Sequence, residues 1–92
     1  MQQMRVDKFL KVSRIIKRRT VAKEACEGGR VKVNGTSAKP GRSISPGDRI
    51  EVAFGNRVLE VKVMDVRSHV PAPRATELYE VIREEYSDDE KY

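Results

Sequence analysis

Residues 5–24 read RVDKFLKVSRIIKRRTVAKE and carry two helix patterns joined by a run of basic residues. In the first pattern Asp7 can act as the N-cap of a helix over residues 8–16, because its carboxylate can accept hydrogen bonds from the first turn. At 100° per residue the apolar side chains near this helix share one face. That face, which we expect to be buried, holds Val6, Phe9, Leu10, Ser13 and Ile16.

A second helix is predicted over residues 21–28. Thr20 precedes it and is a suitable N-cap. The glycine pair 28–29 ends it, since one of the two can adopt the left-handed conformation in which many helices stop. The apolar stripe of this helix predicts a core face made of Val21, Ala22, Ala25 and Cys26.

After the glycines the apolar residues recur at every second position, which is typical of β-strands. Residues 30–33 alternate in this way, and Asn34-Gly35 is a strong hairpin signal because both residues tolerate positive φ. Residues 36–39 then provide the return strand.

A second hairpin is predicted further along the chain. Residues 50–54 alternate, Gly55-Asn56 suits a two-residue turn, and a long strand follows over 57–66. The alternation slips between Val63 and Met64, which predicts a β-bulge at that point.

The last part of the chain is predicted to leave the sheet. Residues 67–76 form a proline-containing connector in which Thr76 caps a helix over 77–86, and residues 87–92 form an acidic tail. Helices segregated from a small antiparallel sheet define an α+β fold. The stripe of this final helix holds Leu78, Ile82 and Tyr86.

The charge of the chain is strongly polarised. The 92 residues carry a net charge of +5, but residues 1–50 hold thirteen Lys and Arg against four acidic residues, a balance of +9. Residues 51–92 hold six basic and ten acidic residues, a balance of −4. A basic surface on a small domain favours a polyanionic partner, nucleic acid first and an anionic membrane surface second.

The basic residues concentrate around the starts of the two predicted helices. Seven of the fifteen residues 5–19 are Lys or Arg. The free N–H groups and positive dipole end of the second helix would add to the attraction for phosphate. A solvated basic face kept for solubility remains the alternative. We expect an anion-binding patch made of Arg5, Lys8, Arg14, Lys17, Arg18 and Arg19.

The type of nucleic acid follows from the second helix. A helix-turn-helix protein reads DNA bases with the exposed side of that helix. Here the exposed side holds Lys23, Glu24 and Glu27, which makes it a poor recognition helix. The basic residues lie before the helix instead, which suits contact with the phosphate backbone of structured RNA.

The composition argues against an enzyme. A single cysteine, Cys26, and a single histidine, His69, offer neither a disulfide, nor a transition-metal site, nor a convincing catalytic triad. We expect no catalytic residue, no metal and no cofactor. No apolar run approaches 18 residues and no signal segment is evident, so we expect a cytoplasmic protein. We also expect a monomer.

The quoted run, together with Gly29-Arg-Val-Lys-Val-Asn-Gly35 and Pro46-Gly-Asp48, resembles the S4-type RNA-binding domain over residues 5–66. The resemblance implies two helices that form an RNA-binding motif called alpha-L, packed on a small antiparallel sheet. It also implies that Arg5, before the first helix, and Arg19, before the second, contact RNA.

Within the family the chain is most similar to the short stand-alone members of bacterial ribosome-associated quality control. That likeness implies binding to obstructed large ribosomal subunits, through rRNA and peptidyl-tRNA, while the partner RqcH brings alanyl-tRNA for mRNA-free alanine tailing. The alternatives are the family's ribosome-associated heat-shock protein, which acts on nascent-chain-blocked large subunits, and a general RNA-binding translation regulator. An RNA-modifying enzyme of the family would need a further catalytic domain.

Overall fold

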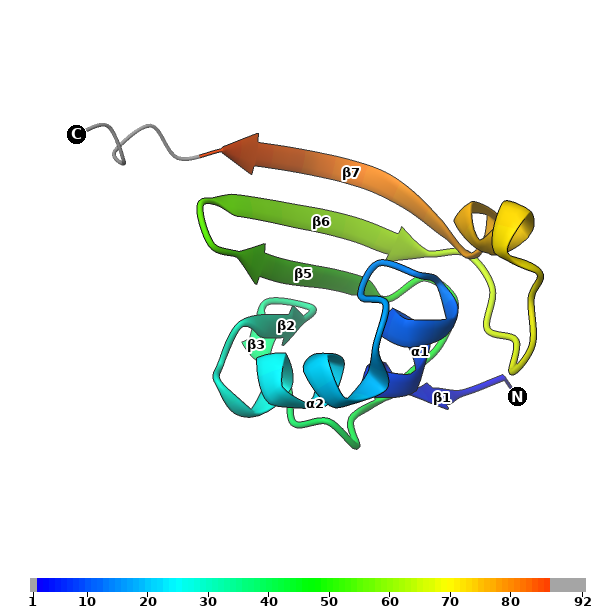
Figure 1. The fold of residues 1–92 in the computed structure, drawn as a ribbon, viewed down its shortest axis with the longest axis horizontal. Helices are drawn as coiled ribbons and strands as arrows, with labels where there is room; N and C mark the ends of the chain where they lie inside the picture. The colour runs from blue at the N-terminus through cyan, green and yellow to red at the C-terminus, as the bar shows by residue number, and fades with distance from the viewer. Residues whose placement is uncertain (1, 87–92) are drawn as a thin grey trace.

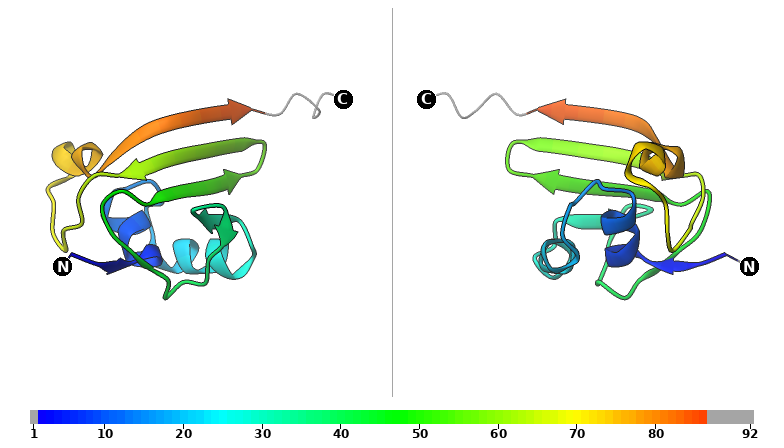
Figure 2. Two further views of the ribbon diagram at one scale, coloured as in Figure 1. Left: turned by 180° about the vertical axis from the view of Figure 1, so that it is seen from behind. Right: turned by 45° about the vertical axis from the view of Figure 1, so that its right-hand side comes forward.

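An antiparallel five-stranded sheet forms one layer of the computed structural model, and two α-helices lie against one of its faces (Figures 1 and 2). The structure describes residues 2–86. The strand order is β3-β2-β5-β6-β7, so β7 is an edge strand. A separate two-stranded ladder joins β1 to β4. The strands are β1 (Met4–Arg5), β2 (Val31–Val33), β3 (Thr36–Ser37), β4 (Ser43–Ile44), β5 (Arg49–Phe54), β6 (Arg57–Val63) and β7 (Tyr79–Tyr86); the helices are α1 (Val6–Val12), α2 (Arg19–Glu27) and the 3-10 helix η1 (Ala72–Leu78).

Both α-helices are present, but they begin earlier than the sequence predicts. The first residue outside α1 is Arg5, so the prediction of Asp7 as the N-cap of a helix over 8–16 is wrong. The chain enters α1 directly from the β1–β4 ladder, and the Val6 N–H donates to the Arg42 carbonyl at 2.8 Å. The first turn of α1 is therefore anchored by backbone contacts with another loop, and Asp7 lies within this turn and not before it.

The junction between the helices also differs from the prediction. The first α-helix ends at Val12, and Arg14 adopts a left-handed conformation with φ 65°, which stops the helix before residue 16. The second begins at Arg19, so Thr20 lies inside α2 and is not its cap. The end of α2 is as expected, since Gly29 has φ +78° immediately after the helix.

The central hairpins follow the predicted pattern. Asn34 and Gly35 have φ of 52° and 87°, the combination that a tight hairpin turn between β2 and β3 requires. The β5–β6 hairpin closes with Phe54 directly opposite Arg57. Two details of β6 were predicted wrongly, because this strand ends at Val63 and not at residue 66, and the irregular pairing lies at Glu60/Val61 on the side of β7.

The C-terminal segment is a strand where the sequence predicted a helix. Residues 72–78 form η1, which covers the end of the expected connector and the first two residues of the predicted helix, and Tyr79–Tyr86 continue as β7 along β6. The predicted helix over 77–86 and its cap at Thr76 are therefore wrong, although the α+β class with an S4-type arrangement is confirmed. The predicted acidic tail, residues 87–92, lies outside the described residues.

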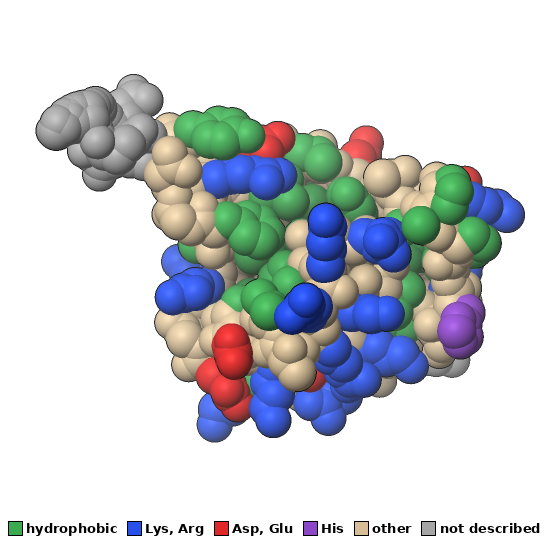
Figure 3. All heavy atoms as spheres, viewed as in Figure 1, with side chains coloured by type: hydrophobic (Ala, Val, Ile, Leu, Met, Phe, Trp, Pro, Cys, Tyr) green, Lys and Arg blue, Asp and Glu red, His purple; other side chains and the backbone are tan. Residues whose placement is uncertain are grey.

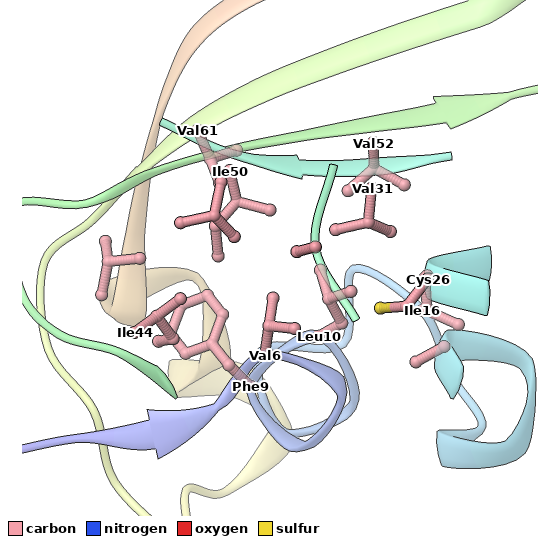
Figure 4. Close-up of a cluster of buried hydrophobic side chains, with 14 of the residues drawn as sticks. Val6, Phe9, Leu10, Ile16, Cys26, Val31, Ile44, Ile50, Val52 and Val61 are labelled. Carbon is pink, nitrogen blue, oxygen red and sulfur yellow. The ribbon is translucent and has the colours of Figure 1, made fainter. Parts of the chain in front are cut away.

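The core lies between α1 and the inner face of the sheet (Figure 4). Val6, Phe9 and Leu10 of α1 are fully buried and point toward strand residues such as Ile50 and Val61 (Figure 4). Burying each side chain of this size contributes roughly 1.5–3 kcal/mol. The core face predicted for the first helix is confirmed. No helix among residues 2–86 is long and apolar enough to cross a membrane.

The face predicted for the second helix needs one correction. Ala22, Ala25 and Cys26 are buried, but Val21 is 46% exposed. Val21 belongs to a different surface, between α2 and the end of β5.

Candidate RNA interface

The basic surface is defined here as the side chains of Arg5, Lys8, Arg14, Lys17, Arg18 and Arg19. These residues come from the start of α1, its exposed side, and the junction that leads into α2. On the face shown in Figure 3, Lys and Arg side chains gather over the two helices. The predicted concentration of positive charge is therefore a surface of the folded protein.

Two arginines of this surface are joined by one buried carboxylate. The Nε and Nη2 atoms of Arg5 donate to the two Asp7 oxygens, each at 3.1 Å. Arg19 Nη2 lies 3.5 Å from Asp7 Oδ1. The same oxygen accepts a 2.7 Å hydrogen bond from the Lys8 backbone N–H. Asp7 thus holds the start of α1 and the start of α2 together.

The side chains of Asp7, Arg5 and Arg19 differ in how far they are exposed to solvent. The Asp7 side chain is only 2% exposed, whereas the side chains of Arg5 and Arg19 are 52% and 47% exposed. Arg5 uses two of its five N–H donors on Asp7, whereas Arg19 is held to Asp7 by an ion pair. The remaining donors face solvent in orientations that the carboxylate restricts. The pair is therefore preorganised for two acceptor groups, such as phosphates.

The other predicted residues surround this pair without touching Asp7 through their side chains. Arg14, Lys17 and Arg18 are exposed in or next to the junction between the helices. Lys8 is half-buried, and its Nζ lies 3.5 Å from Ser68 Oγ. The structure therefore brings Arg5 and Arg19 together through their shared contacts with Asp7, while the other four residues add positive charge around them.

A loop that the sequence analysis did not assign to the site lies beside Arg5. The Asp7 N–H donates to the Pro40 carbonyl at 3.3 Å, and Arg42 follows in the same loop. A Cβ added at Gly41 would lie 3.9 Å from the Arg5 guanidinium carbon. Lys39 and Arg42 are both exposed. Their positive charge therefore extends the basic surface, and only the β1–β4 pairing reveals it.

Cys26 is not available as a nucleophile. Its side chain is buried in the core. Burial first, and then the negative charges of Asp7 and Glu27, raise the pKa of the Cys26 thiol to about 11. The thiol therefore stays protonated near neutral pH, which fits the packing role expected from its place in α2.

This combination of a two-helix motif, a small antiparallel sheet and a basic surface at the helix starts defines an S4-type domain. The S4 domain family model matches residues 4–50. The chain belongs to the S4 domain family.

Within that family, the chain is similar over nearly its whole length to proteins named "RQC P-site tRNA stabilizing factor". The relative from Listeria monocytogenes is 47% identical over 88 residues, which cover 96% of both chains. That from Bacillus subtilis is 44% identical over 82 residues, covering 89% of this chain and 95% of the relative. The resemblance to quality-control members of the family is thereby confirmed.

Heat-shock relatives share the fold as well. The "Heat shock protein 15 homolog" of Aeromonas salmonicida is 40% identical over 79 residues, which cover 85% of this chain and 60% of that protein. A solved structure, described as trimeric, of Vibrio cholerae Heat Shock Protein 15 matches with a TM-score of 0.80 at 32% identity, covering 87% of this chain and 82% of that one.

Proposed function

We propose that this chain is a non-enzymatic, ribosome-associated RNA-binding factor of bacterial quality control, of the RqcP type. It binds large ribosomal subunits that remain obstructed by a peptidyl-tRNA, and it contacts both rRNA and tRNA. By holding the tRNA it supports rounds of mRNA-free alanine addition that depend on RqcH. The observation that carries the proposal is the pair of half-exposed arginines, Arg5 and Arg19, fixed by the buried Asp7 at the meeting point of two helices.

The chemistry of this site suits phosphate contact. Two guanidinium groups held by one carboxylate can each donate to a phosphate oxygen, and charge-assisted hydrogen bonds of this kind are short and directional. The surrounding lysines and arginines add a long-range attraction that does not depend on sequence. The protein thus stabilises a bound RNA, and the ribosome makes the peptide bonds. We take the factor to act as a monomer in the cytoplasm.

The similarity to Heat Shock Protein 15 supports a second candidate. A factor of that type would act on nascent-chain-blocked large subunits without alanine tailing. The two candidates share the same basic surface, so they differ in their partner and in the fate of the nascent chain.

One experiment addresses both candidates. The tagged chain is recovered from cells in which translation is stalled, and the bound material is analysed for large subunits, peptidyl-tRNA and RqcH. We expect all three, together with nascent chains that carry alanine tails. Large subunits with peptidyl-tRNA but without RqcH or alanine tails would favour the heat-shock candidate. Recovery of no ribosomal subunits would contradict the proposed function.

A further inference from the structure

A pocket of about 300 Å³ opens between α2 and the far end of β5. Its α2 wall is formed by Val21 and Ala25, and its sheet wall includes the Phe54 ring. Two charged side chains of opposite sign, Glu24 and Arg30, also line it. Val21 is 46% exposed, so a large apolar side chain is left open to solvent at the mouth of this pocket.

The pocket is continuous with the basic surface. Ile16, which lines the pocket, is followed directly by Lys17 and Arg18, and Val21 lies two residues after Arg19. On the face shown in Figure 3, hydrophobic side chains are exposed over the strands, next to the Lys and Arg side chains that lie over the helices. An RNA strand on the basic surface would therefore pass the mouth of the pocket.

The residues that line the pocket suit the base of a nucleotide better than its phosphate group. For a phosphate group the attraction of Arg30 is offset by the repulsion of Glu24, and the apolar walls add nothing. A nucleobase has two apolar faces and an edge that carries hydrogen-bond donors and acceptors. The Arg57 guanidinium lies over the Phe54 ring, 5.3 Å from its centroid, so a base would pack against Val21 and the part of Phe54 that lines the pocket. Glu24 would accept and Arg30 would donate hydrogen bonds at the edge of the base.

We propose that this pocket receives the unstacked base of a single RNA nucleotide whose neighbouring phosphates lie on the basic surface. The proposal rests on the proposed RNA-binding function and names the feature of the RNA that the chain recognises. Proteins recognise folded RNA largely through loops and bulges whose bases are splayed out of the helix. The preferred ligand is therefore a helix with a bulged nucleotide, not a continuous duplex.

Three RNA hairpins of otherwise identical sequence test this proposal with the full-length chain. The first carries one bulged adenosine, the second carries an abasic nucleotide at the same bulge, and the third is fully paired. The abasic probe keeps the backbone distortion and the phosphate while it removes only the base. We expect the adenosine bulge to bind roughly five- to tenfold more tightly than the abasic bulge, which is the low end of the gain from stacking one base on an aromatic side chain.

Two substitutions on α2 that leave the charge unchanged test whether the preference for the adenosine bulge arises in the pocket. Val21→Gln places a polar amide in the mouth of the pocket without changing charge, so it should bring the ratio of the two bulge affinities close to one. Thr20→Gln alters an exposed neighbour that does not line the pocket, and the ratio should remain. Equal binding of both bulges by the unmodified chain would overturn the pocket but leave RNA binding intact. Binding of none of the three hairpins would overturn both the pocket and the proposed function.

Discussion

Arg19 Nη2 lies 3.5 Å from Asp7 Oδ1, although the two residues belong to different helices. The same carboxylate accepts two hydrogen bonds from Arg5 in a bidentate contact. A single buried acidic residue therefore determines where two cations of the basic surface stand. In the sequence, the sign of this role is that Asp7 stands among seven basic residues in 5–19.

Replacing this acid tests whether position or net charge governs RNA binding. Asp7→Asn raises the net charge by one, which by long-range attraction alone would strengthen RNA binding. We expect weaker binding, by about tenfold, because Arg5 and Arg19 lose the charged partner that fixes their orientation. The free energy of unfolding should fall by about 1–2 kcal/mol, a modest loss because both guanidinium groups are half exposed and screened by solvent. Filter binding and thermal unfolding measure the two quantities.

Asp65→Asn is the matched control for that change. Asp65 pairs with Arg67 at 2.7 Å, so its replacement adds the same unit of charge without breaking any contact of Arg5 or Arg19 with Asp7. Its affinity for RNA should stay the same or increase slightly. If both variants bind RNA more tightly, the orientation of the two arginines has no role in binding.

The contacts of Asp7 with the two arginines could not all be predicted from the local sequence. Aspartate before an apolar helix pattern is a common N-cap. Here the competing partners were stronger, because two guanidinium groups and a buried setting hold the carboxylate. One of these partners, Arg19, lies twelve positions further along the chain. Such a contact requires the packing of α1 against α2, and no local pattern contains it.

The hairpins were predictable because their signals are local. The Asn34-Gly35 turn needs two positive φ values, and the alternation that begins at residue 50 directly encodes the buried face of β5. Arg5 and Arg19 could be proposed as site residues from the density of basic residues in 5–19, and the family resemblance implies the same two arginines. The conformation of the residues between the helices could not be predicted, because it depends on the left-handed turn at Arg14.

The segment 77–86 shows the opposite case. Leu78, Ile82 and Tyr86 follow a helical spacing, but the segment pairs with β6 and becomes a strand. Its charges match the strand beside it, since Glu80 lies opposite Lys62 and Arg83 opposite Glu60. Cross-strand pairs of opposite charge stabilise a sheet. That match can be seen only once the register of β6 and β7 is known. Pairing with β6 therefore outweighed the local helical pattern.

Removing either arginine should abolish co-sedimentation with large ribosomal subunits. Arg5→Ala and Arg19→Ala each delete a preorganised phosphate donor, and both side chains are about half exposed, so the fold should survive. Sucrose-gradient sedimentation measures binding, and circular dichroism checks the fold.

Arg49→Ala provides the control for lost charge. Arg49 is exposed and lies opposite Lys62 on β6, and its neighbour Ile50 points into the core, so Arg49 faces away from the helices. This variant should still sediment with large subunits. Unchanged sedimentation of the Arg5 and Arg19 variants would remove both residues from the site.

The dependence of RNA affinity on salt should report the number of phosphates in contact. With about five contacts to structured RNA, the logarithm of the association constant should fall against log salt with a slope on the order of −3.5 to −4.5. Arg19→Ala should make that slope shallower by about 0.7–0.9, the share of a single phosphate contact. Fluorescence anisotropy over a salt series measures both slopes. A flat response in the unmodified chain would contradict an electrostatic interface.

Cys26 should be inert in the folded protein and should link stability to alkaline pH. Its pKa is raised to about 11 from 9.0, so the folded state keeps the proton at a pH where the unfolded chain loses it. Stability from this residue is therefore complete below pH 9 and declines as the pH rises toward 11. Thermal unfolding across this range should show a smaller decline for Cys26→Ala than for the unmodified chain. Rapid modification of the native protein by a thiol reagent at pH 8 would show that the thiol is neither buried nor protonated.

Two C-terminal truncations should separate the strand from the residues that follow it. Deleting residues 87–92 removes a net charge of −2 and leaves every pairing of β7 with β6 in place. RNA binding should then stay the same or become slightly stronger, because a source of repulsion for phosphate has gone. A large loss of affinity would mean that these six residues contribute to the interface.

Deleting residues 79–92 should instead destabilise the whole domain. That truncation removes one of the two strands that flank β6 and opens the sheet beside Val61 and Val63, both 1% exposed in the intact chain. Exposing side chains of this size costs roughly 1.5–3 kcal/mol each, so we expect a loss of at least about 3 kcal/mol. For a domain of this length such a loss lowers the melting temperature by about 12–24 °C. Differential scanning calorimetry of the two truncations measures the difference, and equal melting temperatures would show that β7 adds nothing to the stability of the sheet.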